Sequence, residues 1–241
     1  MAIRLRDDGA TVLAAGLPAA FALREQPAAT QFEKEVAGGA ALGEGLRSRV
    51  FWIIVIVLFF SSISQNGAIA HLAALLTDRG VAPAQAARAM SVMGAAVLAG
   101  RLITGWLLDR YFAPRVACCL LVFGACGTFL LAGARTMAGG ALGAALIGFG
   151  MGGEADVTPY LIAKYFGLRS FSTLYGFTWT AYAIAGAIGP VIMGMAYDAT
   201  GTYQALLTRL ALATLGAASL MLWMPRIHEP AAMPVLAAAA E

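Results

Sequence analysis

The sequence predicts an all-α membrane protein in which six transmembrane helices form a 3+3 inverted repeat. Three observations support this prediction. Hydrophobic residues make up 60% of the 241 residues and charged residues only 12%, whereas an ordinary soluble domain carries roughly 25% charged residues. The apolar residues gather into long segments, and two of these segments end in the same short motif. The composition therefore argues against a soluble domain.

Each apolar segment is long enough to cross a bilayer as a helix. A transmembrane helix needs about 20 mainly apolar residues. The segments lie at roughly 51–76, 89–108, 116–134, 136–163, 171–197 and 203–224. The connectors between them are short and contain turn residues, for example "DRYFAPR" and "DATGT". Six spans joined by short turns are therefore expected.

Basic residues indicate which side of the membrane the ends of the chain face, because cytoplasmic loops carry an excess of Lys and Arg. If the first segment starts inside, the inner side holds Arg47, Arg49, Arg110, Arg115, Lys164, Arg169 and Arg226. The outer side then holds only Arg79, Arg88 and Arg135. Three tryptophans, Trp52, Trp106 and Trp223, also fall near inner ends. We expect a multi-pass protein of the cell (inner) membrane with both termini in the cytoplasm.

Composition divides the chain into three parts. Residues 49–226 form the expected six-helix transmembrane domain, and residues 227–241 a cytoplasmic tail. Residues 1–48 are rich in Ala and Gly with charges of both signs. We expect them to form a cytoplasmic segment, made of the end of a preceding helix and a central loop. The apolar stretch at 11–23 is too short to span a bilayer, and a signal-peptide core or an interfacial helix are its alternatives.

The repeated motif occurs at the ends of the second and fifth segments. "GRLITGWLLD" (100–109) and "GPVIMGMAYD" (189–198) both follow the pattern G-x4-G-x3-D. An odd number of crossings separates the two copies, so they end on opposite faces of the membrane. Inverted repeats of this kind are typical of secondary transporters. Chance matching is the alternative, because the chain contains 28 glycines.

Longer motifs resemble a known family. "GRLITGWLLDRYFAPR", "GFGMGGEADVTPYLIAKYFG" and "YGFTWTAYAIAGAIGPVIMGMAYDATGTY" are similar to the C-terminal half of a major facilitator superfamily transporter, in the branch of oxalate/formate antiporters and monocarboxylate carriers. The superfamily's gating-loop signature, G-x3-D-R-x-G-R-[RK], is matched at Gly105, Asp109, Arg110 and Arg115, and the chain departs from it at residues 112–113. The resemblance covers about residues 20 to 226.

The resemblance implies secondary active transport of a small organic anion by alternating access. Such carriers have two six-helix halves with the substrate between them, so the second half would be another copy of this chain or a separately encoded N-terminal half. A truncated non-transporting fragment or an accessory membrane subunit is the alternative. The chain contains neither H-E-x-x-H nor G-x-S-x-G, so an enzyme is not expected. Neither is a cofactor, a metal ion or a nucleic-acid partner.

Arg101 is the main candidate for substrate binding. It lies inside an apolar segment, where a charged side chain costs at least about 2.5 kcal/mol. A guanidinium group binds a carboxylate through two parallel hydrogen bonds. The resemblance likewise implies a substrate-binding Arg on this helix. A structural ion pair, or a side chain that reaches back to the inner interface, is the alternative.

Polar residues of the first and fifth segments are the next candidates. Gln65 and Asn66 lie on the first segment, and Thr178 and Tyr182 on the fifth. Thr178 and Tyr182 are one helical turn apart and share a face, as Ser61 and Gln65 do. Such residues line a substrate path or hold helices together.

Three titratable residues are candidates for proton coupling or an ion pair. Glu154 and Asp156 are two positions apart, so they point to different faces of their helix. One of them could neutralise Arg101 or carry a proton. The alternative is a cluster with basic residues at the cytoplasmic end. His71, near an outer end, is a weaker candidate.

Two further features of the sequence bear on the substrate and on nucleotide binding. Oxalate-type carriers are similar in having a Lys in the fifth segment, and this chain has none there, which favours a monocarboxylate over a dicarboxylate. "GFGMGG" at 148–153 imitates a nucleotide-binding fingerprint, but no strand precedes it. Close helix packing through small residues is the better interpretation.

Overall fold

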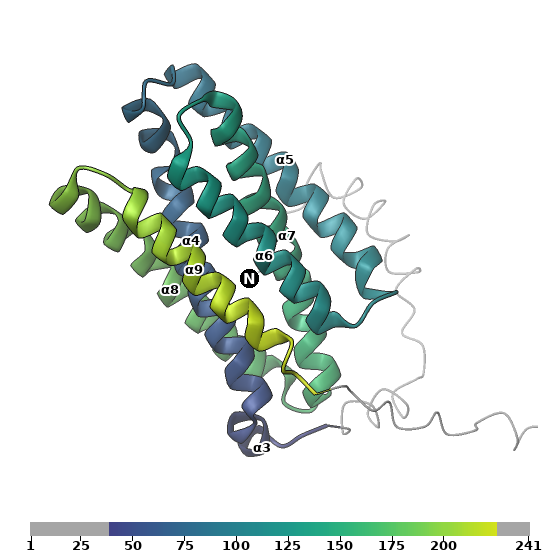
Figure 1. Ribbon diagram of the computed structural model, residues 1–241. Coiled ribbons are helices and arrows are strands. Elements are labelled where there is room, and N and C mark those ends of the chain that lie inside the picture. The colour runs from purple at the N-terminus through teal and green to yellow at the C-terminus, as the bar shows by residue number, and fades with distance from the viewer. Residues whose placement is uncertain (1–38, 226–241) are drawn as a thin grey trace, which may run out of the picture. The chain divides into compact units, whose positions relative to one another are not determined.

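The computed structural model describes residues 39–225, and within this range the chain is helical (Figure 1). The helices are α3 (Leu42–Arg47), α4 (Arg49–Asp78), α5 (Pro83–Leu108), α6 (Ala113–Gly133), α7 (Met137–Phe166), α8 (Phe171–Thr200) and α9 (Gln204–Met221). The predicted preceding helix and cytoplasmic tail lie outside these residues. The predicted transmembrane domain at 49–226 begins where α4 begins.

The long helices agree with the predicted segments to within about three residues, except at the start of α5. This helix begins at Pro83 rather than near residue 89. Proline suits the first turn of a helix, because its fixed φ is helical and it needs no hydrogen-bond acceptor there. The sequence interpretation had assigned these residues to the connector.

The lengths and compositions of the helices fit a membrane protein. Five helices are long and apolar enough to span a bilayer: α4, α5, α6, α8 and α9. α7 is 30 residues long, as α4 is, and it carries many glycines together with Glu154 and Asp156. It packs along both α5 and α6. All six predicted helices are therefore present in one bundle.

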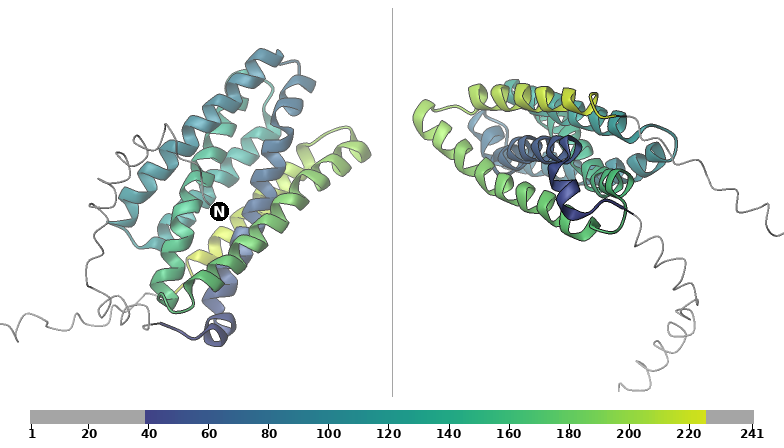
Figure 2. Two further views of the ribbon diagram at one scale, coloured as in Figure 1. Left: turned by 180° about the vertical axis from the view of Figure 1, so that it is seen from behind. Right: turned by 90° about the horizontal axis from the view of Figure 1, so that it is seen from below.

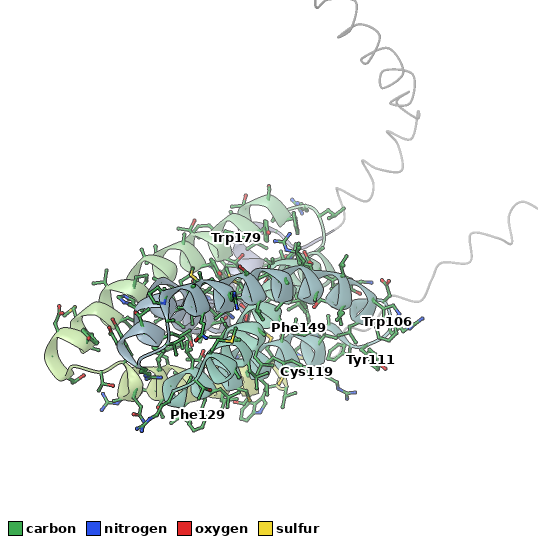
Figure 3. The ribbon with its side chains drawn as sticks, turned by 90° about the horizontal axis from the view of Figure 1, so that it is seen from above. Trp106, Tyr111, Cys119, Phe129, Phe149 and Trp179 are labelled. Carbon is green, nitrogen blue, oxygen red and sulfur yellow. The ribbon has the colours of Figure 1, made fainter. Side chains whose placement is uncertain are left out.

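The helix contacts confirm the inverted repeat. α5 packs along α7 as α8 packs along α4, and α6 packs on α7 as α9 packs on α4. If α4, α5 and α6 are matched with α7, α8 and α9, the contacts that α5 and α6 make with α7 map onto the contacts that α8 and α9 make with α4. α4 and α7 lie in a middle layer, between the pair α6 and α9 on one side and α5 and α8 on the other (Figures 2 and 3).

Glycines permit the closest of these helix contacts. A Cβ atom at Gly100 of α5 would overlap the carbonyl oxygen of Phe149 on α7, and one at Gly189 of α8 would overlap that of Ile63 on α4. Gly100 and Gly189 are the first glycines of the two motif copies. Gly152 lies equally close to the backbone of α5. The run at 148–153 is therefore a packing surface.

The helices differ strongly in burial. In the most apolar stretches of α4 and α6, 56% of residues are buried, against 17% in those of α5 and α8. Large apolar side chains cover the outer faces of these two helices, among them Leu102 at 79% exposure and Met195 at 64%. Such faces require lipid or a partner protein to cover them.

Aromatic side chains mark one end of the bundle. Trp52 begins α4, while Trp106 and Trp223 lie at the ends of α5 and α9, which run in the opposite direction. All three are more than half exposed. Indole rings favour the membrane interface. The three cysteines are free thiols: Cys119 and Cys126 are exposed, whereas Cys118 packs against the hydrophobic core.

Two connections between turns stiffen the ends of the bundle. Arg79, just after α4, donates hydrogen bonds to the last carbonyl groups of α6, those of Leu131 (2.8 Å), Ala132 (2.9 Å) and Ala134 (2.6 Å). Burial, and secondarily the nearby Arg135, lower the pKa of Arg79 from its ordinary value. The guanidinium group thus caps α6.

The second connection lies at the opposite end, where the chain enters α3. The Ala40 amide donates to the Phe166 carbonyl (2.8 Å), and the Ser170 hydroxyl donates to the Ala40 carbonyl (3.0 Å). Gly39 forms a bridge with Gly167, whose φ of 73° favours glycine. The segment before α3 is thereby tied to the turn between α7 and α8.

Candidate functional site

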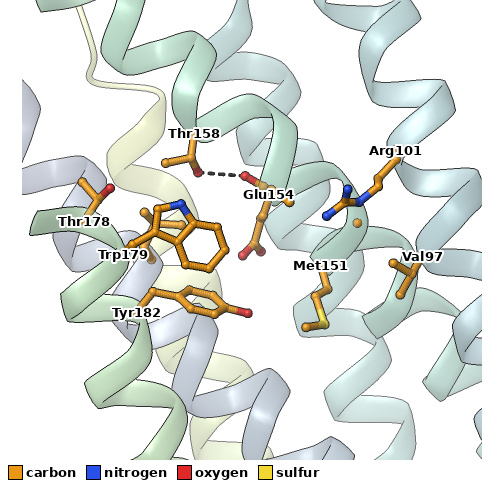
Figure 4. A pocket seen from close by; sticks show the side chains of 11 residues that line it. Val97, Arg101, Met151, Glu154, Thr158, Thr178, Trp179 and Tyr182 are labelled. Carbon is orange, nitrogen blue, oxygen red and sulfur yellow. Dashed lines mark hydrogen bonds between the residues drawn. The ribbon is translucent and has the colours of Figure 1, made fainter. Parts of the chain in front are cut away.

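Arg101 projects from α5 toward α7 (Figure 4). At 1.5 Å per residue it lies about 27 Å from the start of α5 and about 10 Å from its end. Its side chain is exposed in this six-helix unit. Among residues 39–225 it makes no hydrogen bond or ion pair. The structural ion pair considered as an alternative is therefore not found in the described part of the chain.

Arg101 lies at a pocket of about 160 Å³ formed by four helices. α7 contributes Glu154, and α8 contributes Thr178, Trp179 and Tyr182. The rest of the wall is largely apolar: Leu58 of α4, Val97 of α5 and Met151 of α7. The pocket thus brings together residues predicted separately on three helices. It combines one cation, one carboxyl group and an apolar wall.

Glu154 is buried, at 5% exposure, among neutral partners. The Ser61 hydroxyl lies 2.8 and 2.6 Å from its two carboxyl oxygens, and the Gln65 amide nitrogen lies 2.7 Å from one of them. The same Gln65 amide also donates to Ser61 (2.9 Å). From the sequence, a cluster with basic residues at the cytoplasmic end was the alternative for Glu154. In the structure, the carboxyl group of Glu154 instead contacts Ser61 and Gln65 of α4.

Gln65 is itself almost fully buried, at 1% exposure, and it does not line the pocket. Its carbonyl oxygen has no hydrogen-bond partner among residues 39–225. Gln65 therefore contacts Glu154 rather than the pocket. Its position explains why Ser61 and Gln65, one turn apart on α4, act together on a single carboxyl group.

Asn66 joins a second polar contact, between α4 and α8. Its amide donates to the hydroxyl of Ser62 (3.1 Å) and lies 3.5 Å from the hydroxyl of Tyr182. Ser62 in turn donates to the backbone carbonyl of Tyr182 (2.7 Å). Asn66 does not line the pocket. In this conformation it holds two helices together, while Tyr182 lines the pocket.

Asp156 and His71 do not line the pocket. Asp156 is half-buried, and within residues 39–225 it has no hydrogen-bond or ion-pair partner. His71 lies farther along α4, with its Nε2 3.1 Å from the carbonyl oxygen of Pro190 and its ring 5.2 Å from that of Tyr203. The structure thus separates Glu154 from both other titratable candidates.

The gating-loop motif is at the end of the bundle, away from the pocket. Gly105 and Asp109 are exposed on the last turns of α5, and Arg115 is exposed at the start of α6. The guanidinium carbon of Arg110 lies 4.3 Å from the centre of the Trp106 ring, a cation–π contact. The motif thus stands at one end of the helix bundle rather than at the pocket.

Sequence reasoning missed Trp179, which forms much of the pocket wall (Figure 4). It belongs to a row of aromatic rings on α8. Successive ring centres are 5.4 Å apart from Phe171 to Tyr175, 6.0 Å from Tyr175 to Trp179, and 5.1 Å from Trp179 to Tyr182. The spacing of four, four and three residues was visible in the sequence as one helical face.

Comparisons with known proteins agree with this architecture. The family profile of the Major Facilitator Superfamily matches residues 8–190. The uncharacterized MFS-type transporter YhjX of Escherichia coli is 29% identical over 147 residues, covering 59% of this chain and 36% of that protein. Monocarboxylate transporter 12 of Rattus norvegicus is 27% identical over 159 residues, covering 64% of this chain and 33% of that protein.

The solved structures include the fucose:proton symporter FucP of E. coli. It matches with a TM-score of 0.62 at 18% identity, over 77% of this chain and 45% of that chain. This likeness supports the fold. The chain spans about a third of the length of the curated relatives that it matches. These relatives are transporters, which bears out the prediction that the chain is not an enzyme.

Proposed function

The chain belongs to the Major Facilitator Superfamily, and on that basis we propose that it carries a small monocarboxylate across the cell (inner) membrane by alternating access. The observation that supports this proposal is the position of Arg101. Its guanidinium group stands at a pocket among apolar helices, with no acidic partner in residues 39–225. A cation in such surroundings is stabilised by an anion that binds there.

Glu154 is the proposed carrier of a coupled proton. Its partners Ser61 and Gln65 are neutral, so an ionised Glu154 has no bound cation to offset its burial. It also lines the pocket that contains Arg101. An ionised Glu154 would repel a substrate carboxylate in the same pocket. Protonation removes this repulsion, which favours movement of substrate and proton together.

Thr178 and Tyr182 are proposed to contact the substrate, because both line the pocket. Gln65 and Asn66 are proposed to act indirectly, Gln65 by holding Glu154 and Asn66 by holding Tyr182. The loop motif from Gly105 to Arg115 is proposed to act in gating at the cytoplasmic end. The seven-to-three bias of basic residues supports cytoplasmic termini.

The carrier is proposed to be completed by a second six-helix half, either another copy of this chain or a separate N-terminal half. α5 and α8, which contribute Arg101 and Trp179 to the pocket, are the least buried of the spanning helices for which burial is compared. A partner on these helices would enclose the pocket. Six crossings return the chain to its starting side, so two copies can share one orientation in the membrane.

Carboxylate uptake into proteoliposomes tests the role of Arg101. We expect Arg101→Lys and Arg101→Ala to lower saturable uptake by at least tenfold, because neither side chain provides the two parallel donors of a guanidinium group. Arg88→Ala is the matched control, since Arg88 is an exposed cation on the same helix and does not line the pocket. Equal uptake by wild-type protein and both Arg101 variants would refute the proposal.

A non-transporting fragment or accessory subunit is the second candidate, favoured by the exposed faces of α5 and α8. Equilibrium binding of carboxylates to the protein in nanodiscs separates the two. Binding that depends on Arg101 without transport would indicate a half that requires a partner. Transport by the purified chain alone would exclude the second candidate.

A further inference from the structure

We infer that the transported anion is a carboxylate with a planar apolar tail, such as an aromatic monocarboxylate, and that Trp179 and Tyr182 bind that tail. The inference rests on the proposed function, since it takes Arg101 as the site of the carboxylate. It adds the substrate class, which the position of Arg101 alone does not give. The wall of the pocket opposite Arg101 indicates this substrate class.

Two aromatic rings form that wall. Trp179 and Tyr182 follow each other by about one turn of α8, and their ring centres are 5.1 Å apart with an angle of 67° between the planes. The Trp179 ring also makes an edge-to-face contact with Tyr175, and contacts of this kind are favourable between aromatic rings. Both side chains line the pocket, and Trp179 is 41% exposed in the six-helix unit. A substrate ring would extend an aromatic cluster that already exists.

The remaining lining suits the same tail. Met151 of α7, Val97 of α5 and Leu58 of α4 add aliphatic surface. A methionine sulfur packs favourably against an aromatic ring, and its flexible side chain adjusts to different shapes. Thr178 also lines the pocket, but its hydroxyl already donates to the Tyr175 carbonyl (2.7 Å). The Thr178 hydroxyl is therefore not a free hydrogen-bond donor for a small hydroxy acid.

The charge and the aromatic wall occupy different sides of the pocket. In Figure 4, Arg101 lies on one side and Trp179 and Tyr182 on the other, with Glu154 and Met151 between them. This separation fits a molecule with a carboxylate at one end and a ring at the other. The size agrees, because a cavity of about 150 Å³ is known to hold benzene and this pocket measures about 160 Å³.

A competition series tests the inference. Acetate, lactate and pyruvate are compared with benzoate, phenylacetate and indole-3-acetate, by binding in nanodiscs and by uptake into proteoliposomes. We expect the aromatic anions to bind at least tenfold more tightly. Trp179→Leu should weaken aromatic binding about tenfold and leave aliphatic binding within about twofold, whereas Trp179→Phe should keep most of the preference.

Trp223→Leu is the matched control, because Trp223 is 83% exposed and does not line the pocket. If Trp179→Leu weakens both substrate classes equally, its role is structural and the inference is wrong. If aliphatic anions bind as tightly as aromatic ones and still require Arg101, the inference fails while the proposed function stands. If Arg101 variants bind every carboxylate as wild type does, the proposed function fails and the inference with it.

Discussion

The two copies of the repeated motif share their packing but differ in chemistry. Gly100 on α5 and Gly189 on α8 each lie against a carbonyl oxygen of the middle helix beside them. The residue that follows is Arg101 in one copy and Pro190 in the other. Arg101 reaches the pocket, whereas the carbonyl of Pro190 contacts His71. The repeat therefore keeps the glycine that brings two helices together and varies the residue next to it.

The two helices that carry the motif copies also contribute opposite sides of the same pocket. α5 provides the cation, and α8 provides the aromatic wall of Trp179 and Tyr182. Equivalent helices thus approach one pocket from two directions with complementary groups. This comparison separates positions that fix the scaffold from positions that determine what the pocket binds, and substitutions can test that separation.

The largest effect is expected where the motif glycine is replaced. Gly100→Leu places a side chain against the Phe149 carbonyl, and overpacking of this kind typically costs 1–3 kcal/mol or more when backbone must move. We expect little folded protein, measured by thermal unfolding in detergent. Gly105→Leu is the control, since a Cβ there meets no atom within 4 Å. Equal stability of the two variants would contradict this account of the repeat.

Glu154→Gln tests whether Glu154 of α7, in the middle layer, carries the coupled proton. The amide side chain keeps hydrogen bonds to Ser61 and Gln65 but cannot carry a proton. We expect uptake driven by a pH gradient to fall at least tenfold, while exchange of substrate across the membrane continues. Asp156→Asn is the control, because Asp156 lies two residues away and outside the pocket. Gradient-driven uptake by the Glu154 variant at the wild-type level would remove Glu154 from the coupling step.

Arg79→Ala should lower stability without changing binding. The substitution removes the donors to the Leu131, Ala132 and Ala134 carbonyls, and a lost set of charged hydrogen bonds costs about 1–3 kcal/mol. Thermal unfolding measures the loss, and substrate affinity should stay within about twofold. Arg135→Ala provides the comparison at the same end of the bundle. A large change in affinity would indicate that this end contributes to the substrate path.

The smallest effect is expected at His71. Because the ring contacts the Pro190 carbonyl and Tyr203 rather than the pocket, His71→Gln should change uptake by no more than about twofold at any pH between 5 and 8. Uptake measured across that range would reveal a proton relay through His71 as a shifted pH profile. Such a shift would show that the second motif copy also has a chemical role.

Much of the fold was predictable, because hydrophobicity and glycine spacing are local properties of the sequence. The six segments and the repeat follow from them. The predicted start of α5 near residue 89 was wrong, because Pro83 begins the helix and does not belong to the connector. The helix contacts that relate the two halves are long-range, so they required the structure.

The pocket was predictable only in part. Arg101 and Glu154 were identified as charges within apolar segments, and Tyr182 as a polar group. The partners of Glu154 were not identifiable, because periodicity gives the face of a helix but neither the neighbouring helix nor the relative height. Trp179 was passed over because a tryptophan in an apolar segment looks like ordinary lipid-facing surface.

The contacts at Ala40 have a mechanical consequence. Since the strand-like residues before α3 bond to Phe166 and Ser170, any pull exerted through the preceding chain is delivered to the α7–α8 corner as well as to the start of α4. Glu154 lies on α7 and Trp179 on α8. A displacement of the residues before α3 would therefore move both of these sides of the pocket at the same time.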